Sequence, residues 1–368
     1  MPFEKKSVIT VEKMNKSFYA VIMAGGGGTR LWPLSRVNRP KQMLKLGSKR
    51  TLFQQAVDRL NGVIAPEQIL VVTGATMAAD LQKDCPEIPA ENYLIEPAPK
   101  GTAAVVGLAA AYLEQRDRNA VMAILTADHI IQDVSYFQKI LDLADRMARE
   151  GYLVTLGIRP SHPSTAYGYI QRGRTIAEVD QQLVYEVIRF KEKPDYETAR
   201  RMVESGDHDW NSGMFFWQVS RIRKEIESYL PELFHVMTAI ERFGFDHPEK
   251  WLDAWMQLKP ETIDYGIMEH ARQVVVIPAA GLGWNDVGSW DSLFEVLEKD
   301  GDGNIFLAPQ LISFDARNSL VLTEDENRLI AMVGVENLIV VDSGNILLVC
   351  DKDNAQSVRE IVKMLKQS

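Results

Sequence analysis

Strand-like apolar runs alternate with helix-length stretches from residue 17 to residue 158, and this alternation limits the fold more than any other feature. The apolar runs are Ser17–Met23, Gln68–Thr73, Val121–Thr126 and Tyr152–Ile158, and the helical stretches are Leu52–Leu60, Thr102–Gln115 and Phe137–Glu150. Strands and helices in this order form βαβ units, whose right-handed crossovers place helices on both faces of a sheet. The sequence therefore predicts an α/β fold with a Rossmann-like, mostly parallel sheet.

The middle of the chain is less regular. Tyr167–Arg172 and Leu183–Lys191 have the composition of strands, and we expect them to form a hairpin-like insertion over one edge of the sheet. Phe215–Val219 predicts one more strand. Residues 221–269 have a helical pattern that prolines interrupt, so several short helices are expected there.

A boundary is predicted near Lys299–Asn304, where acidic residues and glycines cluster. Short β-rich pieces separated by turn residues follow it: Leu311–Phe314, Leu320–Leu322, Leu329–Val333, Leu338–Asp342 and Asn345–Val349. They indicate a small all-β unit such as a left-handed β-helix, although no clean repeat is visible, and an amphipathic helix, Asn354–Lys366, closes it. We expect a polar extension over residues 1–16, an α/β domain over 17–300 and a β-rich domain over 301–368.

Charge and composition exclude several classes of protein. The formal net charge of −9 argues against a general nucleic-acid or anionic-membrane surface. The two cysteines, Cys85 and Cys350, have no metal-ligand spacing and indicate free thiols in a reducing compartment. The polar start lacks the apolar stretch of a signal peptide, and no apolar run approaches the roughly 20 residues that cross a bilayer. These observations predict a cytoplasmic protein with neither a nucleic-acid nor a membrane partner.

Four consecutive glycines, residues 25–28, follow the first predicted strand. Glycines let the backbone approach a polyphosphate closely and point N–H groups at it, and Arg30 adds a cation with bidentate geometry. A flexible turn is an equally good interpretation of the glycines alone. The cluster lacks the Gly-Lys-Ser/Thr ending of a P-loop and the spaced glycines of a dinucleotide fold, which argues against a nicotinamide dehydrogenase.

The residues around this loop carry a resemblance to a known family. Ala24–Arg36, followed by Arg39-Pro-Lys-Gln42, is similar to the signature of bacterial mannose-1-phosphate guanylyltransferases. The resemblance implies a GT-A-like nucleotidyltransferase domain whose loop wraps the nucleotide triphosphate. Its loop residues here are Ala24, Gly25, Gly26, Gly28 and Thr29. Arg30 and Lys41 would neutralise the phosphates and stabilise the leaving pyrophosphate.

Two aspartates are candidate metal ligands. Asp128 follows the third predicted strand, and ligands in open α/β sheets gather at the carboxyl ends of strands. Asp286 lies between glycines and tryptophans in Gly283–Trp290. A helix N-cap is the alternative for Asp128, and an Asx turn is the alternative for Asp286. The resemblance implies that both hold a catalytic Mg²⁺ that bridges the α-phosphate and the sugar phosphate, whereas His129 is expected to be structural.

Further stretches resemble the family's sugar-phosphate elements. Phe190–Pro194 implies that Glu192 binds the sugar and Lys193 its phosphate, although Lys193 faces the other side of a strand unless the turn at Pro194 redirects it. Tyr167 and Gly168 match one element, and Asn211 and Gly213 match another, all on the sugar side. Glu96 is assigned to the nucleotide. We interpret Glu261–Glu269 mainly as structural.

Two short stretches depart from the family pattern. Ser164–Ala166 replaces the usual Glu-Thr-Gly, and Ala98–Ala103 replaces a stretch that usually ends in Arg-Asn-Thr-Ala. Both border the base and sugar pockets that the resemblance implies. Base and sugar preference therefore follow least directly from it.

The resemblance predicts transfer of GMP from GTP to mannose 1-phosphate, giving GDP-mannose and pyrophosphate. Only this transferase activity is expected, without the isomerase domain that is fused in longer relatives. The same chemistry on another pair, such as glucose 1-phosphate with UTP, dTTP or ATP, is the nearest alternative, and a non-catalytic sugar-nucleotide sensor is a more distant one. The β-rich domain could serve dimerisation, regulation or stability, so a homodimer is one expectation.

Overall fold

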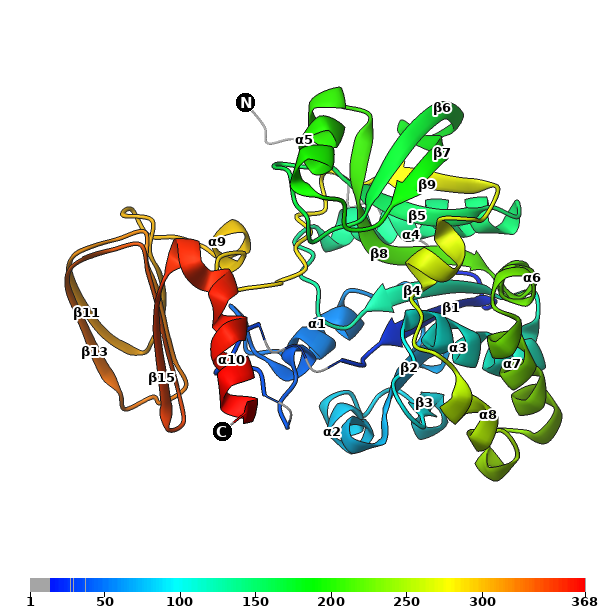
Figure 1. The fold of residues 1–368 in the computed structure, drawn as a ribbon, viewed down its shortest axis with the longest axis horizontal. Coiled ribbons are helices and arrows are strands. Elements are labelled where there is room, and N and C mark those ends of the chain that lie inside the picture. The colour runs from blue at the N-terminus through cyan, green and yellow to red at the C-terminus, as the bar shows by residue number, and fades with distance from the viewer. Residues whose placement is uncertain (1–13, 27, 29, 37, 368) are drawn as a thin grey trace, which may run out of the picture. The chain divides into compact units, whose positions relative to one another are not determined.

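The computed structural model describes residues 14–26, 28, 30–36 and 38–367, which form two compact units (Figure 1). The first, which we call the sheet unit, comprises the described residues up to Met23 together with 57–126 and 133–282. The second, the solenoid unit, comprises 24–56, 127–132 and the chain from Gly283 onward. The predicted polar extension, residues 1–16, falls almost wholly outside the described residues.

A nine-stranded sheet organises the sheet unit, in the order β3-β2-β1-β4-β8-β5-β9-β7-β6. Its strands are β1 (Phe18–Met23), β2 (Ile69–Gly74), β3 (Tyr93–Glu96), β4 (Val121–Thr126), β5 (Leu153–Ile158), β6 (Tyr169–Val179), β7 (Gln182–Lys191), β8 (His208–Gln218) and β9 (Val274–Pro278). Strands β1 to β4 pair in parallel, as do β5 and β9, whereas β6, β7 and β8 add antiparallel pairings. The predicted α/β class is confirmed.

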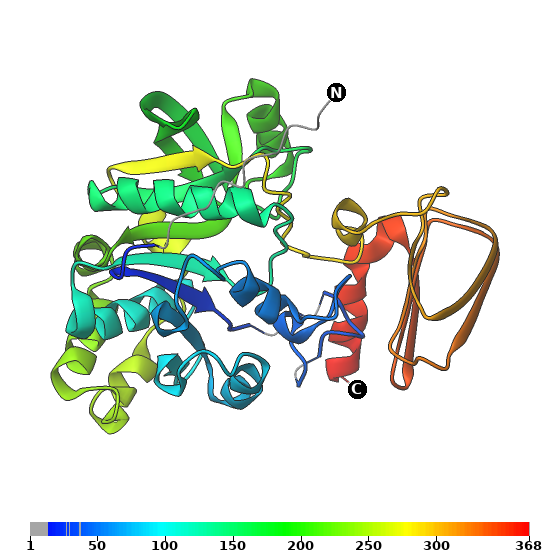
Figure 2. The same cartoon turned by 180° about the vertical axis from the view of Figure 1, so that it is seen from behind.

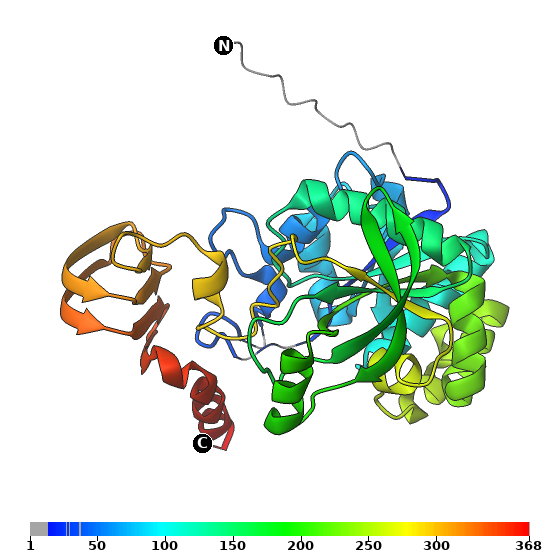
Figure 3. The same cartoon turned by 90° about the horizontal axis from the view of Figure 1, so that it is seen from above.

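The far half of the sheet closes on itself. Strand β6 pairs with β7 and also with β8, so β8, β5, β9, β7 and β6 form a ring of paired strands. The predicted hairpin insertion is the pair β6–β7, the long green strands of Figures 1 and 3. Closure removes one sheet edge, and it brings the start of β6, the end of β7 and the start of β8 together.

Helices cover both faces of the sheet (Figures 1 and 2). The helices α3 (Thr102–Asp117), α6 (Val219–Tyr229) and α7 (Pro231–Phe243) share one buried apolar cluster with one face of the strands. Helix α4 (Val134–Arg149) lies along the other face. It begins at Asp133, whose Oδ1 accepts a 2.8 Å hydrogen bond from the Tyr136 backbone N–H. This cap and the 3.6-residue spacing of its apolar side chains specify α4 locally.

The structure also contains elements that the sequence pattern did not predict, among them β3, β9, α2 (Ala75–Asp84) and α5 (Tyr196–Ser205). Strand β8 begins at His208, whereas the pattern predicted a strand only from Phe215. Its first half contains Asn211 and Ser212, which are polar but buried, so the apolar alternation is hidden there. The remaining helices are α1 (Leu52–Asp58), α8 (Leu252–Gln257), α9 (Leu293–Val296) and α10 (Val358–Gln367), and a single π-helical turn, η5, spans Asp264–Met268.

The β-rich pieces after residue 304 stack as a solenoid, drawn in orange in Figures 1 and 3. Their strands are β10 (Ile305–Leu307), β11 (Gln310–Arg317), β12 (Leu320–Thr323), β13 (Leu329–Glu336), β14 (Leu338–Ser343) and β15 (Ile346–Asp351). Parallel pairs join β11 to β13 and β12 to β14, and Thr323 bonds Asp342, 19 residues further on. One turn of the solenoid thus takes 19 residues. It forms although no sequence repeat is visible, because a turn requires only that apolar residues point inward.

The segment that follows β1 belongs to the solenoid unit. Leu31, Leu34 and Leu44 are buried in one cluster with the apolar side chains of β12 and β14. Arg36 Nη2 donates to the Ser343 backbone oxygen at 2.8 Å, and Arg36 Nε donates to the Pro33 oxygen at 2.8 Å. Much of the Trp-Pro-Leu-Ser-Arg sequence therefore anchors this segment to the solenoid.

Candidate active site

The glycine loop leaves β1 at Ala24, which is buried, and Gly25, Gly26 and Gly28 are exposed. Gly26 has φ +100°, a backbone conformation that favours glycine. The buried amide of Gln42 donates to the Ala24 backbone oxygen at 3.0 Å and so fixes the start of the loop. Arg30 is exposed, and Thr29 lies outside the described residues. The loop therefore presents backbone and one guanidinium to solvent, as a phosphate cradle requires.

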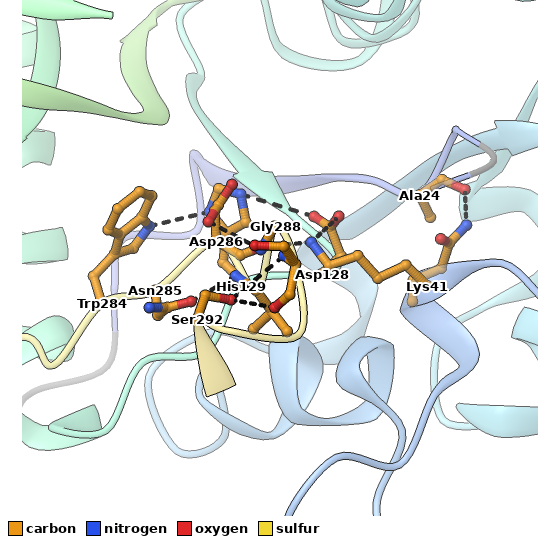
Figure 4. A network of polar contacts seen from close by, with 12 residues as sticks. Ala24, Lys41, Asp128, His129, Trp284, Asn285, Asp286, Gly288 and Ser292 are labelled. Atoms are coloured by element: carbon orange, nitrogen blue, oxygen red, sulfur yellow. Dashed lines mark hydrogen bonds and ion pairs between the residues drawn. The ribbon is translucent and has the colours of Figure 1, made fainter. Parts of the chain in front are cut away.

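Lys41 joins the two predicted metal loops (Figure 4). It belongs to the short helical turn Lys41–Met43 and is buried. Its ammonium donates to Asp128 Oδ2 at 2.8 Å and also to the Asp286 backbone oxygen. The structure thus brings Lys41, Asp128 and Asp286 together, although they are widely separated in the sequence.

A short antiparallel bridge explains how the two aspartates meet. The Ile130 N–H donates to the Asn285 oxygen at 2.9 Å, and the Asn285 N–H donates to the Ile130 oxygen at 3.0 Å. Asp128 and Asp286 flank this bridge on their two segments. Two backbone hydrogen bonds therefore hold one aspartate loop against the other.

The Asp286 loop is strained. Val287 is a buried β-branched residue with φ +47°, in the left-handed region that such residues rarely adopt. Its N–H donates to Asn285 Oδ1 at 2.7 Å, and the Gly288 N–H donates to Asp286 Oδ1 at 3.1 Å. The bond to Asp286 Oδ1 forms the Asx turn that the sequence pattern indicated as the alternative role of Asp286. This bond also fixes the direction of the Asp286 carboxylate, so it is compatible with a ligand role.

His129 lies on the other side of Asp128. Trp284 Nε1–H donates to His129 Nδ1 at 3.1 Å, and His129 Nε2 lies 3.8 Å from Asp128 Oδ1. Burial acts to raise the pKa of the Asp128 carboxyl, but the charge of Lys41, that of His129 and the Lys41 hydrogen bond together hold this pKa below its ordinary value. Asp128 is therefore ionised at neutral pH and suits a cation.

The second cluster lies in the sheet unit, where the ring of strands closes. Gly168 is buried beside Glu192, and a Cβ at position 168 would overlap Glu192 Oε2. Lys193 has φ +42°, and its ammonium bonds Glu192 Oε1. The left-handed backbone at Lys193 redirects its side chain toward Glu192. The strand pattern alone predicted that Lys193 faces the other side of the strand unless the turn at Pro194 redirects it. Tyr167 packs on Trp210 with ring centroids 4.8 Å apart.

Asn211 is the polar centre of this second cluster. Its Oδ1 accepts hydrogen bonds from Thr155 Oγ1 and the Gly213 N–H, each at 3.2 Å, and its Nδ2 donates to Asp264 Oδ1 at 2.8 Å. Burial and the nearby charge of Glu192 raise the pKa of Asp264 to about 6.

The sequence pattern indicates only a structural role for the segment around Asp264 and therefore misses this residue. Two features of the sequence could have identified it: an aspartate inside an otherwise apolar stretch, and a chain position close to a proline that breaks the helices.

Glu96 ends β3 with its carboxylate turned into the protein. The residue is buried, and its Oε2 has no hydrogen-bond partner among the residues that the structure describes. Burial raises the pKa of Glu96, and the Lys100 backbone N–H partly offsets this effect. A buried acceptor without a donor is rare, so Glu96 is a candidate to receive one from a ligand.

Most of the predicted residues thus belong to two clusters, one around Lys41 in the solenoid unit and one around Asn211 in the sheet unit, whereas Glu96 stands apart at the end of β3. In neither cluster do three or more His, Cys, Asp or Glu side chains among the described residues form a closed metal site. No described helix is long and apolar enough to cross a membrane. A glycine loop with two nearby aspartates, and a separate cluster of polar and acidic side chains on an α/β sheet, are typical of nucleotide-transferring enzymes.

Comparison with known proteins agrees with this class. Residues 19–303 match the family described as Nucleotidyl transferase, and residues 310–365 match the MannoseP isomerase/GMP-like beta-helix domain. The chain therefore belongs to the nucleotidyl transferase family, and it is an enzyme of that class.

Individual relatives show which group within the nucleotidyl transferase family the chain resembles. The mannose-1-phosphate guanylyltransferase of Salmonella muenchen is 36% identical over 353 residues, covering 94% of this chain and 73% of the relative. That of Escherichia coli K12 is 36% identical over 357 residues, covering 95% and 73%. A solved mannose-1-phosphate geranyltransferase from Thermus thermophilus superposes with a TM-score of 0.85 at 31% identity, covering 95% of this chain and 99% of that one. The predicted resemblance to the mannose-1-phosphate guanylyltransferases is confirmed.

Proposed function

We propose that this enzyme transfers GMP from GTP to mannose 1-phosphate and releases GDP-mannose and pyrophosphate. The observation that carries the proposal is the Lys41 ammonium between the Asp128 carboxylate and the Asp286 carbonyl oxygen, in the segment that begins with the glycine loop. A triphosphate and a divalent cation need this combination of a cation and two acidic residues. The relatives' activity supplies the identity of the two substrates.

Asp128 and Asp286 are the residues that would hold Mg²⁺. Mg²⁺ takes one or two protein carboxylates, and waters and substrate phosphates complete its shell. The low pKa of Asp128 and the cation already seated between the two loops support this fit. When bound, Mg²⁺ neutralises the charge of the reacting phosphates. Lys41 would then leave Asp128 and pair with the triphosphate.

The transfer itself requires little covalent work from the protein. An oxygen of the sugar phosphate forms a bond to the α-phosphorus of GTP, and the bond from that phosphorus to the bridging oxygen of pyrophosphate breaks. The attacking phosphate is already ionised, so no general base is needed. The backbone N–H groups of the loop (Ala24, Gly25, Gly26, Gly28, Thr29), with Arg30 and Lys41, stabilise the charge that develops on pyrophosphate.

Glu96 is assigned to the nucleotide. Its buried Oε2 has no partner among the residues that the structure describes, and an N–H group of a base would supply the missing donor. The sugar phosphate is assigned to the second cluster: Tyr167, Gly168, Glu192, Lys193, Asn211 and Gly213.

The alternative that keeps the chemistry is glucose 1-phosphate with UTP, dTTP or ATP. A matrix of these nucleotides and GTP against mannose 1-phosphate and glucose 1-phosphate, read by pyrophosphate release with Mg²⁺, separates the two. We expect GTP with mannose 1-phosphate to have the highest kcat/KM and EDTA to abolish it. A higher kcat/KM for another pair would overturn the substrate assignment, and nucleotide binding without turnover would favour a sensor.

The Asp286→Asn variant tests the metal assignment. Its side chain keeps the size of aspartate and an oxygen for the Gly288 N–H, so the loop should fold. We expect kcat to fall at least about 1,000-fold, because the ion would lose one of its two protein carboxylates. Asp302→Asn, at an exposed position of the same unit, is the matched control. A folded Asp286→Asn enzyme with near-normal turnover would reject the assignment.

Two further expectations are part of the proposal. We place the functional boundary between residues 300 and 301, with residues 17–300 catalytic and 301–368 accessory. We also propose a homodimer, supported by the exposed apolar residues on the outer face of the solenoid.

A further inference from the structure

The side-chain amide of Asn211 is fixed in orientation by three hydrogen bonds. Thr155 Oγ1 and the Gly213 N–H occupy its oxygen, and Asp264 Oδ1 accepts one of its two N–H groups at 2.8 Å. An amide in this network cannot rotate without losing bonds, because the Gly213 N–H requires the oxygen to remain where it is. One N–H of a buried amide is left to bind something else.

Asp264 is the second part of the same arrangement. It opens the π-helical turn η5, an irregularity that occurs often at functional sites. Its Oδ1 accepts the Asn211 N–H, its own backbone N–H also bonds the carboxylate, and Asn211 is its only side-chain donor among the described residues. The charged groups that act on it are Glu192 and Lys193 at the end of β7, while Glu269, at the end of the same turn, accepts the Glu192 backbone N–H at 3.2 Å.

Glu192 is the third member of this polar cluster, beside Asn211 and Asp264. Its side chain is only 9% exposed. One of its carboxylate oxygens pairs with Lys193, and the other lies against Gly168, where any Cβ would displace it. Two carboxylates and a single amide N–H are thus grouped where the ring of strands closes, and the charges of the carboxylates repel.

The arrangement matches neighbouring hydroxyl groups. A hydroxyl both donates and accepts, so one can donate to Asp264 while its neighbour donates to Glu192, and either can accept the Asn211 N–H. Hydrogen bonds to charged acceptors are stronger than neutral ones. A site that offers charged acceptors to two neighbouring hydroxyls rejects analogues that lack one of these hydroxyls, because a buried acceptor would then stay unpaired.

We propose that Asp264 determines which sugar this enzyme accepts, by taking a hydrogen bond from one ring hydroxyl and by orienting Asn211 toward the neighbouring one. The inference rests on the proposed function, since it concerns the sugar-phosphate substrate of that reaction. It makes the Glu261–Glu269 segment part of the substrate site.

The test is the Asp264→Asn variant assayed with mannose 1-phosphate and with its 2-, 3-, 4- and 6-deoxy analogues. The new side chain keeps an oxygen for Asn211 but replaces the second acceptor oxygen with a donor. We expect KM for mannose 1-phosphate to rise about 10- to 100-fold, with KM for GTP nearly unchanged. With one deoxy analogue the variant and the wild type should be equal, because the hydroxyl that Asp264 binds is absent.

A merely structural role for Asp264 predicts the same penalty for every analogue, and that result would overturn the inference. Asp253→Asn, at an exposed position on α8, is the matched control. If the wild type itself does not use mannose 1-phosphate with GTP, the proposed function fails independently of Asp264.

The pH dependence of the wild type keeps the inference testable even if Asp264→Asn does not fold. Below its pKa of about 6, Asp264 gains a proton and loses the charged acceptor that binds a hydroxyl most strongly, so KM for mannose 1-phosphate should rise as the pH falls. The substrate phosphate titrates near about pH 6 as well, but it does so equally in every deoxy analogue. The rise should therefore be smaller for one analogue, and identical pH profiles for all of them would contradict the proposal.

Discussion

Lys41 is the residue on which the geometry of the first cluster depends. Its charge is buried, and a buried ammonium is tolerated only where acceptors surround it. It has two such acceptors, the carboxylate of Asp128 and the backbone oxygen of Asp286. One of these acceptors, the Asp128 carboxylate, is also a group that we propose for the metal, so one lysine couples the fold of the site to its charge balance.

Replacing Lys41 with Met separates these two roles. The variant keeps the length of the side chain but leaves Asp128 without its ion pair. We expect kcat/KM to fall at least about 100-fold, and the free energy of unfolding to fall by about 1–2 kcal/mol, because Asp128 is partly exposed and solvent screens its charge. Steady-state kinetics and urea unfolding measure the two effects, with exposed Lys45→Met as the control. Lower stability with full activity would contradict a catalytic role.

Asp264 shows how a binding residue reduces stability. Its pKa rises from 3.8 to about 6 on folding, so between these values the native state binds more protons than the unfolded chain. The Asp264 carboxyl therefore contributes most to the free energy of unfolding below pH 3.8. This contribution is lost as the pH rises through about 6.

The Asp264→Asn variant should accordingly be more stable than the wild type at about pH 8, by about 2 kcal/mol. The gain should shrink progressively as the pH is lowered towards about 4, since the wild-type carboxyl is then protonated in the native state. Urea unfolding of both proteins across this range measures the difference. A gain that does not change with pH would show that the buried charge is not its cause.

Among the elements, helix α3 depends on the residue before it. Gly101 has φ +86° and precedes the helix, and a Cβ at this position would overlap the Glu261 backbone oxygen. The Ala103 N–H also bonds that oxygen at 3.2 Å. The start of α3 and the segment that leads to η5 are thus joined backbone to backbone, and only glycine allows this approach.

Gly101→Ala should lower the free energy of unfolding by at least about 2 kcal/mol, since strain at positive φ and the steric overlap act together. It should also raise KM for the sugar phosphate, because Asp264 lies on the displaced segment. Gly62 also has positive φ, at +85°, but no neighbour within 4 Å, so Gly62→Ala is the control for strain alone. Equal effects of the two substitutions would show that the Glu261 contact is unimportant.

At the scale of the whole molecule, the solenoid has an apolar face on β11 and β13 that is exposed among the residues that the structure describes. Phe314 and Val333 are paired across β11 and β13 and are 74% and 68% exposed, and Ile312 and Leu329 extend the patch on the same side. Contiguous exposed apolar residues of this kind mark interaction surfaces.

The double substitution Phe314→Asp with Val333→Asp should convert the proposed homodimer to a monomer, since it places two charges in the apolar face. Sedimentation velocity measures the association state, and circular dichroism confirms the fold. Exposed Asn327→Asp, in the same unit, should leave the dimer intact. Wild-type protein that sediments as a monomer at all concentrations would refute the homodimer.

The α/β class, the hairpin, the β-rich end and the identity of most of the candidate site residues follow from the sequence alone. These features are encoded locally, in apolar periodicity and in the chemistry of short motifs such as the glycines and Asp128. Strands β3 and β9 escaped the pattern, and so did the first half of β8, where polar Asn211 lies in a buried strand. Local patterns fail there because burial is set by neighbours from distant parts of the chain.

The hydrogen bonds that join the site residues became visible only once the chain was folded. Asp286 reaches Lys41 through the Ile130–Asn285 bridge, and Asp264 reaches Asn211 through a turn that begins 53 residues further along the chain. Apolar periodicity and residue spacing do not predict these hydrogen bonds, because bonds between distant segments depend on how the elements pack and not on the spacing of residues along the chain.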